Sequence, residues 1–174
     1  MTEKQISILH TALKLFSNKG FNAVSTSLIA KEAGVSEGLI FRHFGNKIGL
    51  LQAIMQMGKE KVDVMLEQIA QLVNPVQRVQ AIMELPFHIE EEEYPFWRLV
   101  YALKWQDEYY DDEMSKPTKE ILVKALTEMK YADADAEANL IMSYVDGFAT
   151  TVLLKRDSTD LTLLLETLRK KYKQ

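Results

Sequence analysis

Apolar residues recur every three or four positions along most of this chain, the pattern of helices that bury one face. The first such helix ends before Gly20, a helix stop, and its apolar face carries Ile6, Leu9, Ala12, Leu13 and Phe16. Neither an alternating strand pattern nor a low-complexity tract nor a repeat occurs in the sequence. The pattern therefore predicts an all-α protein of about nine helices.

Two short helices are predicted next, joined by the tight turn Ala33-Gly34-Val35. Ser25 is a good N-cap for the first of them, and Ser36 is a good N-cap for the second. Leu39 and Ile40 cannot both face inward on so short a helix, so one of them is expected to be exposed. This layout is typical of a helix-turn-helix, whose second helix enters a DNA groove.

A long helix is predicted after Gly45-Asn46, and Asn74-Pro75 is expected to end it because proline disfavours helix in the preceding residue. Further helices are predicted at about 76–87, 95–108 and 117–130. Another begins at Asp133 or Asp135, and the last begins near Ser158.

Charge is unevenly distributed along the 174 residues, whose net charge is −4. Residues 1–50 hold six basic and three acidic residues, a balance of +3, which leaves −7 for the remainder. A basic segment attached to an acidic body suits a DNA-binding module joined to another domain, although ordinary variation of a solvated surface also produces such an imbalance.

The sequence has no apolar run of membrane-spanning length and no signal-peptide pattern, so we expect a cytoplasmic protein without a membrane partner.

Catalytic signatures are missing from the sequence. It has three histidines and no cysteine, which excludes disulfides, cysteine-ligated zinc and thiol catalysis. Glu84 and His88 have a spacing suited to metal ligation on a helix, but Pro86 lies between them. We therefore expect neither an enzyme nor a bound metal or cofactor.

Residues 6–51 resemble the N-terminal DNA-binding domain of the TetR family of bacterial transcriptional regulators. The matching residues are ALKLFSNKGF, Ser25, Ile29-Ala30, Ala33-Gly34-Val35-Ser36, Gly38, Phe41, His43-Phe44, Lys47 and Leu50-Leu51. The resemblance implies a homodimeric repressor that binds a palindromic operator in double-stranded DNA and is released by a small, largely apolar effector. It also implies a DNA-binding domain at 1–46 and a helical effector-binding and dimerisation domain at 47–174.

The expected DNA contacts come partly from the residues themselves. Gly38 allows close backbone approach to DNA, and Arg42 and His43 can reach phosphates or bases. The resemblance adds phosphate-binding roles for Ser25, Thr26, Ser27, Ser36, His43 and Lys47. The full expected set is Ser25, Thr26, Ser27, Ser36, Glu37, Gly38, Leu39, Phe41, Arg42, His43 and Lys47.

Three positions depart from the family pattern. Phe41 replaces the usual tyrosine, and Leu28 stands where an acidic residue would complete a capping box with Ser25. Glu37 stands where the family often has a basic or small residue. Its carboxylate either accepts a hydrogen bond from cytosine N4 or only stabilises the first turn of its helix through the helix dipole. These departures leave open a helical adaptor or ligand carrier that does not bind DNA.

Aromatic residues at spacings of four mark the helix predicted at 95–108, and the resemblance implies that this region lines an effector pocket. The candidate effector contacts are Met83, Phe87, His88, Trp97, Tyr101, Trp105, Tyr144 and Phe148. Plain core packing is the alternative for each of them. The acidic runs Glu90–Glu93 and Asp107-Glu108 with Asp111–Glu113 are interpreted as solvated connections, or as the mark of a cationic effector.

The last two predicted helices carry more apolar residues than a small body needs, so we expect them to form a four-helix bundle with a second copy. The candidate interface residues are Leu140, Tyr144, Val152, Leu161, Leu164, Leu165 and Leu168.

Overall fold

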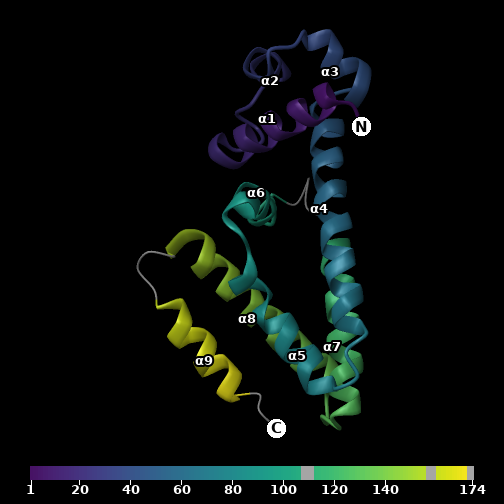
Figure 1. Cartoon of the computed structure of the whole chain (residues 1–174), viewed down its shortest axis with the longest axis vertical. Helices are drawn as coiled ribbons and strands as arrows, with labels where there is room; N and C mark the ends of the chain where they lie inside the picture. Colours follow the sequence, from purple (N-terminus) through teal and green to yellow (C-terminus); the bar gives the residue numbers. More distant parts are fainter. Residues whose placement is uncertain (107–111, 156–159, 172–174) are drawn as a thin grey trace. The chain divides into compact units, whose positions relative to one another are not determined.

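A computed structural model of the chain describes residues 1–106, 112–155 and 160–171 (Figure 1). Nine α-helices and three short 3-10 helices occur among these residues, and no strand does, which confirms the predicted all-α class. The α-helices are α1 (Glu3–Lys19), α2 (Thr26–Ala33), α3 (Glu37–Phe44), α4 (Lys47–Ala70), α5 (Pro75–Glu84), α6 (Tyr94–Leu103), α7 (Lys116–Glu128), α8 (Ala134–Lys155) and α9 (Leu161–Lys171). The 3-10 helices are η1 (Leu85–His88), η2 (Glu91–Glu93) and η3 (Asp112–Met114). Within the described ranges, no helix combines the length and apolarity needed to cross a membrane.

The turns of the N-terminal helices follow from their cap residues. Gly20 ends α1 with a φ of 82°, and Gly34 ends α2 in the left-handed conformation, with φ 66° and ψ 34°. Glycine adopts such a backbone without the strain that a side chain would add. The Ser25 hydroxyl accepts the Leu28 N–H at 3.1 Å, so Ser25 caps α2 as predicted.

Helix ends later in the chain differ from the sequence prediction at several places, since α5 ends at Glu84 and α6 ends at Leu103, before the ends expected near 87 and 108. α4 ends at Ala70, before the predicted stop, and Asn74 begins the next helix because its side chain accepts the Val76 N–H at 2.9 Å. Pro75 is then the first residue of α5, where its missing N–H costs nothing. Ser158, near which the last helix was expected to begin, lies outside the described residues.

The structure divides into two compact units. The first unit contains Met1–Lys61 and Glu92–Tyr110, and the second contains Val62–Glu91 and Asp111–Gln174. The first unit therefore takes in the N-terminal part of α4 and all of α6, in addition to the segment 1–46 expected to bind DNA. The functional division between 46 and 47 stays a prediction.

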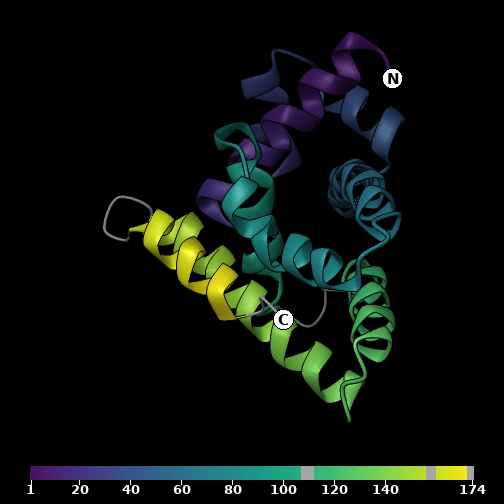
Figure 2. The same ribbon diagram turned by 60° about the horizontal axis from the view of Figure 1, so that its bottom comes forward.

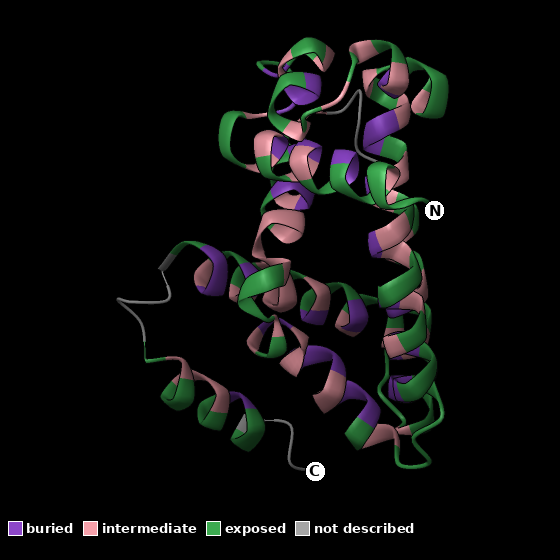
Figure 3. Ribbon diagram, turned by 45° about the horizontal axis from the view of Figure 1, so that its top comes forward, coloured by how far each residue is buried: buried purple, intermediate pink, exposed green. Residues whose placement is uncertain are grey.

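One continuous core holds the first unit together. α1 contacts both α2 and α6, and the buried face of α6 supplies Leu99 and Leu103, each 1% exposed. Figure 3 shows how buried and exposed positions alternate along the helices. Phe96 of α6 lies so close to Gly58 of α4 that its ring fills the place of a side chain there. The core residues are Ile8, Leu9, Ala12, Phe16, Phe21, Val24, Ile29, Ala30, Ile40, Leu50, Leu51, Ile54, Leu99 and Leu103.

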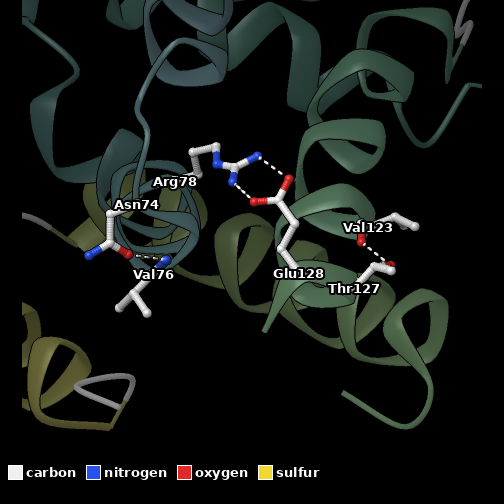
Figure 4. A network of polar contacts seen from close by, with 6 residues as sticks. All are labelled: Asn74, Val76, Arg78, Val123, Thr127 and Glu128. Carbon is white, nitrogen blue, oxygen red and sulfur yellow. Dashed lines mark hydrogen bonds and ion pairs between the residues drawn. The ribbon is translucent and has the colours of Figure 1, made fainter. Parts of the chain in front are cut away.

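The second unit is built around α7, which contacts both α5 and α8 (Figure 2). A buried arginine, Arg78 of α5, forms a two-pronged ion pair with Glu128 at the end of α7 (Figure 4). This guanidinium holds the pKa of Glu128 below its usual range. Arg78 and Glu128 lie 50 residues apart in the sequence, so their ion pair joins α5 to α7. A buried charge destabilises the fold unless an opposite charge lies beside it.

Candidate nucleic-acid interface

α3 turns a defined face toward the core and leaves the opposite face uncovered. Ile40 is fully buried and Phe44 is half-buried, whereas Gly38, Phe41 and Arg42 are exposed. Since Ile40 faces inward, Leu39 takes the outer position of the two, although it still packs partly against the core. The exposed face of α3 is therefore free to meet a groove of DNA, as the helix-turn-helix layout requires.

Thr26 and Glu37 contact each other, which the sequence did not reveal. The Thr26 hydroxyl donates to Oε1 of Glu37 at 2.6 Å, and this bond ties the first turn of α2 to the first turn of α3. Both side chains are half-buried. One oxygen of Glu37 is thus engaged within the protein and does not depend on DNA for a partner.

The serines of this region differ in their engagement. The Ser25 hydroxyl caps α2, while Ser27 is exposed at the start of the same helix. Ser36 occupies the N-cap position of α3 but its side chain makes no capping hydrogen bond. An exposed hydroxyl that is not needed for a cap remains available as a donor to a phosphate oxygen.

Lys47, the first residue of α4, reaches back to the loop between α1 and α2. Its ammonium donates to the backbone carbonyls of Phe21 at 3.1 Å and Val24 at 3.0 Å. It also lies 4.5 Å from the centre of the Phe21 ring, within the range of a cation–π contact. Lys47 therefore fastens the start of α4 to the loop that precedes α2, and one of its three N–H donors is left for a phosphate.

His43 is oriented by Gln5 of α1. The Gln5 carbonyl oxygen accepts the Thr2 N–H at 2.7 Å, so its amide nitrogen is the group that faces Nδ1 of His43 at 3.3 Å. An amide nitrogen can only donate, so Nδ1 acts as the acceptor and the neutral ring carries its proton on Nε2. His43 is exposed, so this proton can be donated to a phosphate.

The candidate effector residues fall in both units. Phe87, Tyr144 and Phe148 come together in the second unit, where the Phe148 ring centre lies 5.3 Å from that of Phe87 and 6.3 Å from that of Tyr144. Met83 is buried in the same unit. His88, in contrast, is largely exposed, and its Nε2 lies 3.7 Å from Glu84.

The remaining effector candidates, Trp97, Tyr101 and Trp105, belong to the first unit. Trp97 packs edge-on against Phe96, with ring centres 5.3 Å apart, and Lys104 lies over the Tyr101 ring. Trp105 is 91% exposed and follows the end of α6, so it lines no enclosed site within its own unit.

The predicted dimer residues differ in how much of their surface is available. Val152 and Leu168 are buried within the chain itself, so we assign them to its own core. Tyr144, Leu161, Leu164 and Leu165 are half-buried, and Leu140 is 45% exposed. Leu154 and Leu163, which sequence analysis did not single out, are 71% and 59% exposed and are the more accessible apolar side chains of α8 and α9.

α9 is held against α5 by a two-pronged ion pair. Nε and Nη2 of Arg169 donate to Oε1 and Oε2 of Glu84, both at 2.7 Å, and this arginine lowers the pKa of Glu84.

In the described ranges, no group of three or more histidines and carboxylates is arranged to hold a metal ion.

These observations define an all-α protein with a helix-turn-helix and a helical body. The sequence model described as "Bacterial regulatory proteins, tetR family" matches residues 8–54. The chain is also 43% identical over 61 residues to the uncharacterized HTH-type transcriptional regulator YvkB of Bacillus subtilis, which covers 35% of this chain and 32% of YvkB. It is 28% identical over 143 residues to the HTH-type transcriptional activator FasR of Mycolicibacterium smegmatis, covering 80% of this chain and 59% of FasR.

Solved structures share the fold over nearly the whole chain. AibR, solved in complex with isovaleryl coenzyme A and operator DNA, superposes with a TM-score of 0.75 at 20% identity, covering 97% of both chains. The matched segments span less than two thirds of either curated relative named above. Residues 8–54 therefore form a DNA-binding domain of the TetR type, and the chain as a whole has the fold of TetR-family structures.

Proposed function

We propose that this protein is a homodimeric repressor that binds a palindromic operator in the cytoplasm and leaves it when a small, largely apolar effector binds. The observation that carries the DNA-binding part is the uncovered face of α3, where Gly38, Phe41 and Arg42 are exposed while Ile40 anchors the helix. The surplus of positive charge in residues 1–50 supports the same function, because DNA binding releases counterions from phosphates. We propose no catalytic role.

Selection of duplexes from a random DNA pool by the purified full-length protein tests DNA binding. The expected result is a palindrome whose half-sites lie about one helical turn, or roughly 34–36 Å, apart. Affinity for the enriched duplex should fall steeply as salt rises. Failure to enrich any duplex at low salt would contradict DNA binding and favour a ligand carrier.

The exposed leucines of α8 and α9 support the dimer. Leu140, Leu154 and Leu163 present apolar surface that a second copy would cover, and a twofold axis brings the same helices of both copies together. Light scattering of the purified protein should give twice the mass of one chain. A monomeric mass at micromolar concentration would contradict the dimer.

Repression and activation are separated by transcription in vitro from a promoter that carries the enriched duplex. We expect the protein to lower transcript yield, and an increase would instead make it an activator, as FasR is named.

Isovaleryl coenzyme A is a suitable first effector probe, since AibR was solved with it and its acyl group is apolar. Release of the duplex by this probe, but not by free coenzyme A, would support an apolar effector.

The cluster of Phe87, Tyr144 and Phe148 supports the apolar character of the effector. Phe148→Ala should reduce the response to the probe and leave DNA binding without effector intact. An unchanged response would remove this cluster from the effector site.

A further inference from the structure

We propose that Arg42 is the residue that reads base sequence, by donating two hydrogen bonds to a guanine in each half-site. This inference rests on the proposed DNA-binding function and names the base-specific contact within it. A guanidinium matches the O6 and N7 acceptors of guanine in the major groove, and this pairing is the commonest specific contact between proteins and DNA.

The position of Arg42 on α3 supports this role. Arg42 is exposed and lies on the side of α3 away from Ile40, which is fully buried. No hydrogen bond or ion pair within the described part of the chain holds the Arg42 side chain. Its guanidinium is therefore not committed to the protein's own structure.

Gly38 leaves space for the Arg42 side chain one turn earlier on the same face. Residues four apart are neighbours on a helix, and helical side chains lean toward the N-terminus, so the Arg42 side chain can extend toward Gly38 when it meets DNA. A side chain added at Gly38 would meet no heavy atom within 4 Å, which means that this space is open. Arg42 can thus reach the N-terminal turn of α3, the part of a recognition helix that contacts base edges.

The contact between Thr26 and Glu37 engages one oxygen of the carboxylate that is the alternative base reader. Glu37 is half-buried and accepts the Thr26 hydroxyl at 2.6 Å, so its carboxylate is directed toward α2. We therefore assign Glu37 to positioning α3 against α2. The Thr26 hydroxyl, which donates in this bond, acts with Glu37 in that positioning.

The test uses the duplex enriched by the wild-type protein, with each base pair of one half-site replaced in turn. Full-length wild-type, Arg42→Lys, Arg42→Ala and Glu37→Gln proteins are titrated against this set. Wild-type should prefer guanine at one position by about tenfold or more, the discrimination of a bidentate contact. Arg42→Lys keeps the charge but loses the two-pronged geometry, so it should lose that preference alone.

Several results separate this inference from the alternatives. If Arg42 contacts phosphate, Arg42→Lys will keep every base preference, while Arg42→Ala will weaken all duplexes equally and flatten the salt dependence. If Glu37 reads a base, Glu37→Gln will change the preferred base. Either result, or an enriched half-site without guanine, would overturn the assignment of Arg42 and leave DNA binding standing. Failure of the wild-type protein to enrich any duplex would instead overturn the proposed function.

A further variant, Gly38→Ala, tests the open space directly. The added methyl group fits the fold, since nothing in the protein lies near it, but it would occupy part of the open surface that the Arg42 side chain would cross to reach a base. We expect a native thermal midpoint together with a loss of several-fold in the preference for guanine. Native discrimination in this variant would contradict the proposed path of the Arg42 side chain.

Discussion

Replacing Lys47 with methionine removes the ammonium that fastens α4 to the loop before α2, and keeps a side chain of similar length. Two hydrogen bonds are lost, to the carbonyls of Phe21 and Val24 at 3.1 and 3.0 Å. Hydrogen bonds to charged groups contribute about 1.5–3 kcal/mol each when buried. Lys47 is only half-buried, so water can satisfy part of what is lost, and we expect a net cost of about 2 kcal/mol in the free energy of unfolding.

Urea unfolding followed by tryptophan fluorescence measures this cost. Both tryptophans, Trp97 and Trp105, belong to the first unit, so the signal reports on the unit that contains Lys47. For a urea dependence of about 2 kcal/mol per molar, the midpoint should fall by about 1 M.

The matched control for this experiment is Lys14→Met, which removes the same charge from an exposed position of α1. Its midpoint should stay within about 0.3 M of wild-type, since exposed substitutions change stability by about 0.5 kcal/mol or less. If the two variants have the same midpoint, the contact of Lys47 with the loop carries no stability and the reasoning fails.

Three further variants test other parts of the structure. In Gly49→Ala, the added carbon would lie 1.9 Å from the Phe44 carbonyl oxygen. This clash should outweigh the gain in helix propensity of about 1 kcal/mol, so we expect a lower thermal midpoint. A raised midpoint would contradict this prediction. Glu84→Gln should lower the urea midpoint at pH 7. The Arg169 hydrogen bond lowers the pKa of Glu84, so its stabilisation is present above the ordinary glutamate pKa of about 4.3 and is lost as the pH falls through the lower folded value. The difference from wild-type should therefore shrink toward pH 3, and a constant difference would refute this origin. Leu163→Glu should halve the mass measured by light scattering, whereas an unchanged dimer would exclude this residue from the interface.

Local signals in the sequence located most helix ends, because each depends on a few neighbouring residues. The predicted cap at Ser25 and the predicted turn at Gly34 are both observed. Asn74-Pro75 was interpreted as a stop, and its actual role is to begin α5, since the same two residues suit either a helix end or a helix start. A local pattern does not distinguish these roles.

Contacts between distant residues were the part that the sequence could not supply. Lys47 has the charge expected of a phosphate ligand, but its partners lie 23 and 26 residues away in a loop. Thr26 and Glu37 were both placed at the DNA interface, yet nothing in their spacing of 11 residues indicated that they would bond to each other. Such pairings depend on how helices pack, which periodicity does not encode.

The inclusion of α6 in the first unit has a consequence for how the protein is made. Leu99 and Leu103 complete the core around α1, although the thirty residues Val62–Glu91 of the second unit lie in the chain between Lys61 and the segment that carries α6. On the ribosome, the segment that carries the helix-turn-helix emerges first but must wait for α6 before its core is closed. A fragment ending at residue 61 would lack this cover and expose apolar surface of α1, so DNA-binding fragments cut at the end of the helix-turn-helix should aggregate unless α6 is supplied with them.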